Sequence, residues 1–187
     1  MIPIYEQQTG NGIGHSQDTF MERFEEICRQ HFTTGRAQSF AFIFYDFGDK
    51  EFRSLLDNQG VFAKLDRLSG TRLSLFYLHA NTKNAIKSFN SKFISKLGID
   101  AKVNLPCIVF FKFNDGSVSD IEVVTLESPS LIHGFMELYE IVRNYLDCSE
   151  STDNSQPRAM KIFKSTAKFI GIETFRVMLK KGLELIM

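Results

Sequence analysis

Two nearly continuous runs of apolar residues constrain the fold of this chain more than any other feature. Residues 39–45 (SFAFIFY) and 71–79 (TRLSLFYLH) are rich in aromatic and branched side chains. Such runs are typical of strands that are buried on both faces. Between them, apolar residues recur at helical spacing over residues 52–68, with Gly60 as a candidate break between two helices. This strand–helix–strand order predicts two parallel strands in an α/β domain.

Further elements are predicted on both sides of these strands. Helical spacing over residues 17–32 and 85–97 indicates two more helices. Residues 107–113 and 117–126 flank an Asn-Asp-Gly hairpin signal, and residues 129–146 form the last helix of the domain. We therefore predict three layers, α/β/α, around a central mixed sheet of about four strands. An extra N-terminal helix and a C-terminal amphipathic helical extension complete the expected fold.

The composition divides the chain into four parts. The polar, glycine-rich start predicts a flexible leader over residues 1–16, followed by the α/β domain at 17–148. Residues 149–157 (SESTDNSQP) have the composition of a linker. Residues 158–187 hold seven basic and two acidic residues among apolar ones, which predicts a basic amphipathic helical segment. The whole chain carries 22 acidic and 22 basic side chains, so its charge does not indicate nucleic acid as a partner.

Residues 105–117 (LPCIVFFKFNDGS) carry a resemblance to a known fold. They are similar to the cis-proline, buried strand and glycine hairpin of the thioredoxin-like superfamily, and the order of elements over residues 39–146 is similar as well. The resemblance implies structural roles for Pro106 and Gly116 and a cis bond between Leu105 and Pro106. X-Pro is the linkage in which a cis bond costs least. The alternative is an ordinary trans proline that opens a strand.

The chain departs from the redox members of that superfamily in its cysteines. Those members carry a C-x-x-C motif where a helix begins after the first central strand, because the helix N-terminus lowers the pKa of the thiol. The corresponding position falls near residues 49–52 (DKEF), and no cysteine lies between Cys28 and Cys107. Dithiol exchange needs two sulfur atoms, so we expect a divergent member without redox activity. Three widely spaced cysteines also predict no disulfide framework and a cytoplasmic location.

Cys107 is the best remaining candidate for a reactive thiol, because it follows the proline on the expected active face. The alternative is a buried and inert side chain that packs as a small hydrophobic group. The four histidines lack metal-ligand spacing, and phosphate-binding and hydrolase motifs are missing. The sequence therefore predicts no metal site and no cofactor. It favours a protein that is not an enzyme, with Cys107 as the weak catalytic candidate.

We expect a non-catalytic interaction or assembly module that binds a protein partner or a second copy of itself. The C-terminal segment is the predicted docking or dimerisation element, since basic amphipathic helices fit partner grooves. The side chains expected to contact the partner are Lys161, Lys164, Lys168, Phe169, Phe175, Lys180 and Lys181. Two alternatives stay open. One is a single-thiol or glutathione-linked oxidoreductase that uses Cys107, and the other, less favoured, is a peripheral membrane protein that uses the basic segment.

Overall fold

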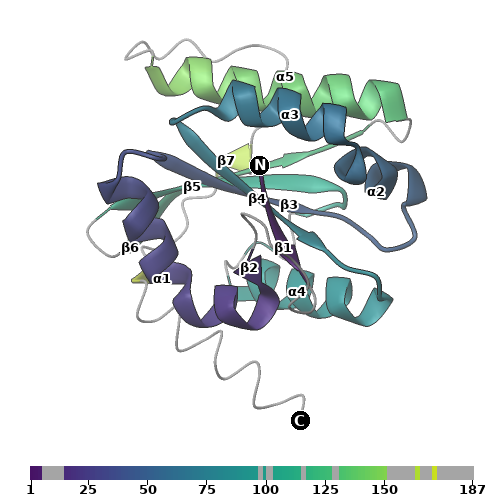
Figure 1. Cartoon of the computed structure of the whole chain (residues 1–187), viewed down its shortest axis with the longest axis horizontal. Coiled ribbons are helices and arrows are strands. Elements are labelled where there is room, and N and C mark those ends of the chain that lie inside the picture. Colours follow the sequence, from purple (N-terminus) through teal and green to yellow (C-terminus); the bar gives the residue numbers. More distant parts are fainter. Residues whose placement is uncertain are drawn as a thin grey trace.

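The two apolar runs form neighbouring strands at the centre of a sheet (Figure 1). Strand β3 (Ser39–Phe44) and strand β4 (Leu73–His79) pair in parallel, with Phe42 opposite Phe76. Every residue of β3 is buried, as expected for a strand covered on both faces. In this computed structural model the described residues are 1–5, 15–96, 99, 103–114, 117–127, 131–150, 163–164 and 170–171.

The sheet is mixed, and its described part contains eight strands. The strand order is β2-β1-β4-β3-β5-β6-β7, and β8 also pairs with β6. Strand β1 lies parallel to β4, whereas β5 is antiparallel to both β3 and β6. The remaining strands are β1 (Ile2–Tyr5), β2 (His15–Ser16), β5 (Cys107–Asn114), β6 (Ser117–Thr125), β7 (Phe163–Lys164) and β8 (Ile170–Gly171). The predicted α/β class and mixed sheet are confirmed.

Helices cover both faces of this sheet (Figure 1). Helices α1 and α4 lie on one face, and α2, α3 and α5 lie on the other. The Ser16 hydroxyl begins α1 by accepting a hydrogen bond from the Thr19 N–H at 3.2 Å. The helices are α1 (Gln17–Thr33), α2 (Lys50–Asp57), α3 (Gln59–Ser69), α4 (Lys83–Lys96) and α5 (Leu131–Glu150).

Phenylalanine side chains fill the layer between the sheet and helices α1 and α4. Phe42 on β3 lies at its centre, with its ring centroid 4.7 Å from Phe93 of α4 and 5.9 Å from Phe24 of α1. Phe110 and Tyr145 stack at 4.0 Å between β5 and α5 on the opposite face. Because strand side chains alternate between faces, one central sheet supplies both halves of the core. This layer accounts for much of the high phenylalanine content.

The sheet extends further than the sequence predicted. Residues 1–16 were expected to form a flexible leader, but Ile2–Tyr5 form β1, in which Ile2 and Ile4 are buried beside β4. The expectation of about four strands is also too low, because β1 joins β3, β4, β5 and β6, and short strands pair at both edges. The helix break falls at Asn58, whose side chain caps α3, rather than at Gly60.

Most of the C-terminal segment, residues 158–187, lies outside the described residues. Its two described parts, Phe163–Lys164 and Ile170–Gly171, are short strands that pair with β6. These two pairs of residues therefore differ from the amphipathic helical segment, of one helix or two divided near Gly171, that the sequence predicted. The predicted linker at 149–157 falls outside the described residues except for its first two residues, which end α5.

Candidate functional site

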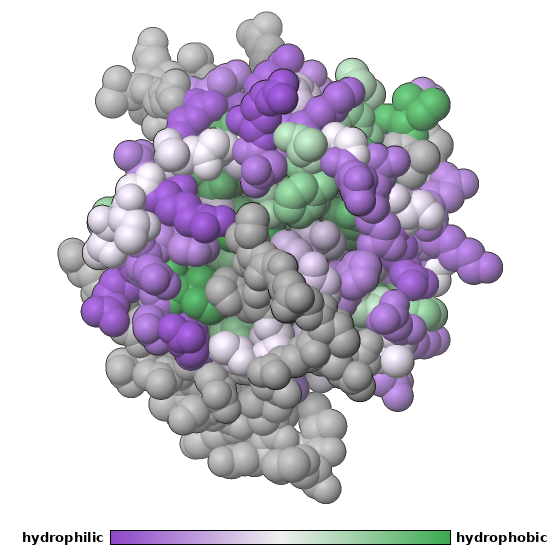
Figure 2. All heavy atoms as spheres, viewed as in Figure 1, coloured by the Kyte–Doolittle hydropathy of each residue, from purple (hydrophilic) through white to green (hydrophobic). Residues whose placement is uncertain are grey.

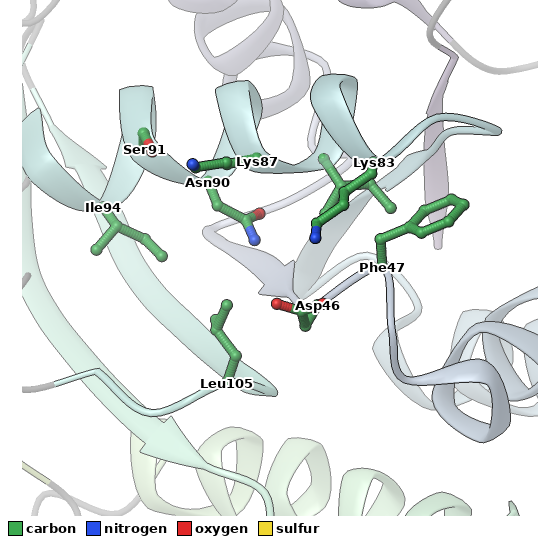
Figure 3. Close-up of a pocket in the computed structure, with 9 residues that line it drawn as sticks. Asp46, Phe47, Lys83, Lys87, Asn90, Ser91, Ile94 and Leu105 are labelled. Atoms are coloured by element: carbon green, nitrogen blue, oxygen red, sulfur yellow. The ribbon is translucent and has the colours of Figure 1, made fainter.

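Three segments that are distant in the sequence meet at one end of the central sheet. Strands β3 and β4 both end there, and β5 begins there, with Cys107 opposite Phe44. The loop after β3, the helix after β4 and the residues before β5 therefore surround a common space. That space is a pocket of about 360 Å³ (Figure 3). Its lining residues are Asp46, Phe47, Lys83, Ile86, Lys87, Asn90, Ser91, Ile94 and Leu105.

The loop between β3 and α2 is held by its own carboxylates. The Asp46 carboxylate accepts a hydrogen bond from the Gly48 N–H at 2.7 Å. The Asp49 carboxylate accepts one from the Phe52 N–H at 2.9 Å and so caps the N-terminus of α2. The Arg53 guanidinium lies 4.1 Å from the centroid of the Phe47 ring, which fixes that ring at the pocket wall. The start of α2 thus carries a capping carboxylate.

Helix α4 forms the opposite wall of the pocket (Figure 3). The buried Asn90 amide donates a hydrogen bond to the Tyr45 carbonyl oxygen at 2.8 Å, which ties α4 to the end of β3. Lys87 lies one turn before Asn90 and Lys83 two turns before it, and both are exposed. Within the described part of the chain, neither ammonium group has a hydrogen-bond or ion-pair partner. This wall therefore combines a fixed amide with two uncompensated positive charges.

The third segment contains the bond between Leu105 and Pro106, which is cis. The Pro106 carbonyl accepts a hydrogen bond from the Leu126 N–H at 2.9 Å, so the loop is anchored to the end of β6. The Leu105 side chain remains 37% exposed and lines the pocket. Apolar surface is thus available to a ligand beside the polar wall of α4.

Cys107 does not line this pocket. Its side chain is fully buried at the start of β5, and burial raises the pKa of the thiol to about 12. A thiol is nucleophilic as the thiolate, so this environment suppresses its reactivity. Cys28 is also buried, and the third cysteine, Cys148, is exposed on α5. The location of Cys107 agrees with the structural interpretation of this residue.

Most of the other predicted site residues lie outside the part of the chain that the structure describes. Gly116 and six of the seven predicted partner-binding residues lie outside the described residues: Lys161, Lys168, Phe169, Phe175, Lys180 and Lys181. Lys164 belongs to β7, which pairs with β6 at Glu122. In the described ranges, no group of three or more His, Cys, Asp or Glu side chains is arranged to hold a metal ion.

Sequence reasoning missed the polar residues of the pocket. Lys83, Lys87, Asn90 and Ile94 follow each other at helical spacing, so they share one side of α4. This spacing was the available signal for the pocket. It was overlooked because the buried Phe89 and Phe93 already accounted for the helical pattern of the segment. Its relation to Asp46 and Leu105 depends on the strand order, which the spacing alone does not determine.

Comparison with family models, with curated proteins and with solved structures found no match for this chain. Among the helices that the structure describes, none has the length and apolar character needed to cross a membrane. The residues of this chain and their arrangement are therefore the basis for a functional proposal.

Proposed function

We propose that this chain is a non-catalytic, thioredoxin-like protein-interaction module. One observation carries the proposal. The loop at the start of α2, where the resemblance places a C-x-x-C motif, contains Asp46 and Asp49 and no sulfur. The cysteine nearest to this loop in the fold, Cys107, is fully buried. The face that redox relatives use for thiol chemistry is thus available for binding alone.

The arrangement of the sheet supports the thioredoxin-like part of the proposal. The strand order β1-β4-β3-β5-β6 places two parallel pairs beside an antiparallel hairpin. The cis bond before Pro106 stands next to the end of β3. The resemblance over residues 39–146 implies the β3–β4 pair, the hairpin and the cis bond, whereas β1 lies outside that range.

The pocket between Asp46, Lys87 and Leu105 supports the binding part of the proposal. Binding sites commonly combine apolar walls with a few fixed polar groups. Here Asn90 supplies the fixed polar group, and Phe47 supplies an aromatic wall. We further propose that the basic segment at residues 158–187 contributes to docking or self-association, and that the protein acts in the cytoplasm.

Assays for disulfide reduction and peroxide turnover test the absence of catalysis. We expect the full chain to reduce insulin disulfides and to consume peroxide no faster than the buffer does, because no accessible low-pKa thiol faces the pocket. Cys107→Ser should leave both rates at that background level. Robust activity that disappears in Cys107→Ser would refute the proposal.

The binding role is tested by capture of partners on the immobilised full chain. Lys180→Glu with Lys181→Glu reverses two charges of the C-terminal segment, whereas Lys64→Glu with Arg67→Glu makes the same change on α3. We expect the C-terminal pair to lower recovery of a specific partner, or self-association measured by sedimentation, by more than the α3 pair. Equal effects of the two pairs would contradict a docking role for the segment.

A further inference from the structure

We propose that the pocket beside α4 binds a monoanionic carboxylate that carries an apolar group. This inference rests on the proposed binding function and names the chemistry of its ligand. The carboxylate lies against Lys83 and Lys87, and the apolar group lies between Ile94 and Leu105 (Figure 3). Both a free short-chain acid and an acidic residue of a peptide present this chemistry.

The positive charges of the pocket select an anion. Lys83 and Lys87 are four residues apart on α4, so both side chains start from the same face of the helix. In the described structure neither is neutralised by an ion pair. Both lie in the first turns of α4, where the helix dipole adds a partial positive charge. A bound carboxylate would compensate charges that the described residues leave uncompensated.

The negative charge of Asp46 limits the charge of the ligand. Among the described residues that line the pocket, Asp46 is the one acidic residue, and its carboxylate already accepts the Gly48 N–H. Two lysines and one aspartate leave a net charge of about +1 on the lining. A monoanion balances this charge, whereas a dianion such as phosphate brings additional repulsion from Asp46. We therefore favour a carboxylate over a phosphate.

The apolar lining requires a hydrocarbon group on the same ligand. Phe47, Ile86, Ile94 and Leu105 all contribute to the pocket, and Leu105 is more than one-third exposed. Covering apolar surface favours binding roughly in proportion to the area that is buried. The volume of about 360 Å³ lies at the lower end of the range for ligand pockets, roughly 300–1,000 Å³. A chain of a few carbon atoms, or one aliphatic side chain, fits this space better than a large cofactor.

Titration of the isotopically labelled full chain with hexanoate, followed by amide chemical shifts in NMR, tests the proposal. Hexanamide is the neutral control of the same shape. We expect hexanoate to shift amide signals of α4 and Leu105 and to bind about fivefold or more tightly than hexanamide. Lys83→Gln with Lys87→Gln should remove this preference. The matched variant Lys64→Gln with Arg67→Gln, which loses two charges on α3, should retain it.

A second titration distinguishes the two sources of the carboxylate. The probes are the blocked peptide acetyl-Leu-Glu-Leu-amide and its uncharged counterpart acetyl-Leu-Gln-Leu-amide. Preference for the glutamate peptide identifies an acidic protein segment as the ligand, whereas preference for hexanoate alone identifies a small acid. Equal binding of each acid and its neutral partner, or shifts confined to other parts of the chain, would overturn the proposal. Insulin reduction by the same preparation would refute the non-catalytic function without affecting this result.

Discussion

Cys107 should be almost unreactive in the folded protein. Its side chain has no exposed surface, and burial raises the pKa of its thiol from the ordinary 9.0 to about 12. Near pH 8, a thiol with the ordinary pKa is roughly one-tenth ionised, whereas a thiol with a pKa of 12 is roughly one ten-thousandth ionised. Loss of thiolate alone should therefore slow its reaction with a disulfide reagent by about 1,000-fold. The absence of exposed surface slows the reaction further.

Labelling with Ellman's reagent measures this protection. The variant Cys28→Ala with Cys148→Ala retains Cys107 alone, and Cys28→Ala with Cys107→Ala retains the exposed Cys148. We expect Cys148 to react at nearly the same rate in native buffer and in guanidinium chloride. Cys107 should react rapidly only after denaturation. A native rate for Cys107 within tenfold of its denatured rate would show an accessible thiolate and refute the structural role assigned to this residue.

Three further predictions concern stability. Burial raises the pKa of the Cys107 thiol and of the Tyr145 hydroxyl to about 12 each, so folding favours their neutral forms. The free energy of unfolding, measured in urea, should fall as the pH rises above about 9 for Cys107 and above about 10 for Tyr145, by up to ~1.4 kcal/mol per pH unit for each group. A profile that stays flat between pH ~9 and ~11 would contradict this. Phe42→Ala removes the centre of the aromatic layer and should cost about 3–5 kcal/mol in urea unfolding, against about 0.5 kcal/mol or less for the exposed Met136→Ala. Asn90→Ala leaves a buried carbonyl at the end of β3 without its donor and should cost about 1–3 kcal/mol, with a normal unfolding curve.

The central strands could be predicted from the sequence because their signal is strong and local. Uninterrupted apolar runs predicted β3 and β4, and the Asn-Asp-Gly sequence signal predicted the boundary between β5 and β6. Strand β1 has only four residues and includes Pro3, so it lacks both the length and the composition of a buried strand. Strand β1 is stabilised by pairing with β4, and the sequence alone does not show that these two segments pair. Short edge strands depend on tertiary contacts in the same way.

The pocket could not be predicted for a related reason. Lys87 and Leu105 lie on separate segments, and they line one space because β4 and β5 both flank β3. The resemblance concerns the missing cysteines near residues 49–52, and these residues are not among those that line the pocket. Of the predicted basic residues of the C-terminal segment, the structure describes Lys164, which does not line the pocket. The others lie outside the described residues. The polar residues on one side of α4 can be recognised as part of a pocket only when the strand order is known.

The loop after β3 carries carboxylates in place of the thiols of redox proteins, and this difference changes the electrostatics at the start of α2. In the redox proteins that the sequence resembles, the positive end of the helix stabilises a thiolate. Here the Asp49 carboxylate occupies that end and accepts the Phe52 N–H, and Asp46 adds a second negative charge nearby. Both charges disfavour a thiolate, so a single cysteine placed in this loop would lack the electrostatic support that activates it. The positive charge of Lys83 and Lys87, for which the described residues supply no ion pair, lies across the pocket, where it can attract an anionic ligand.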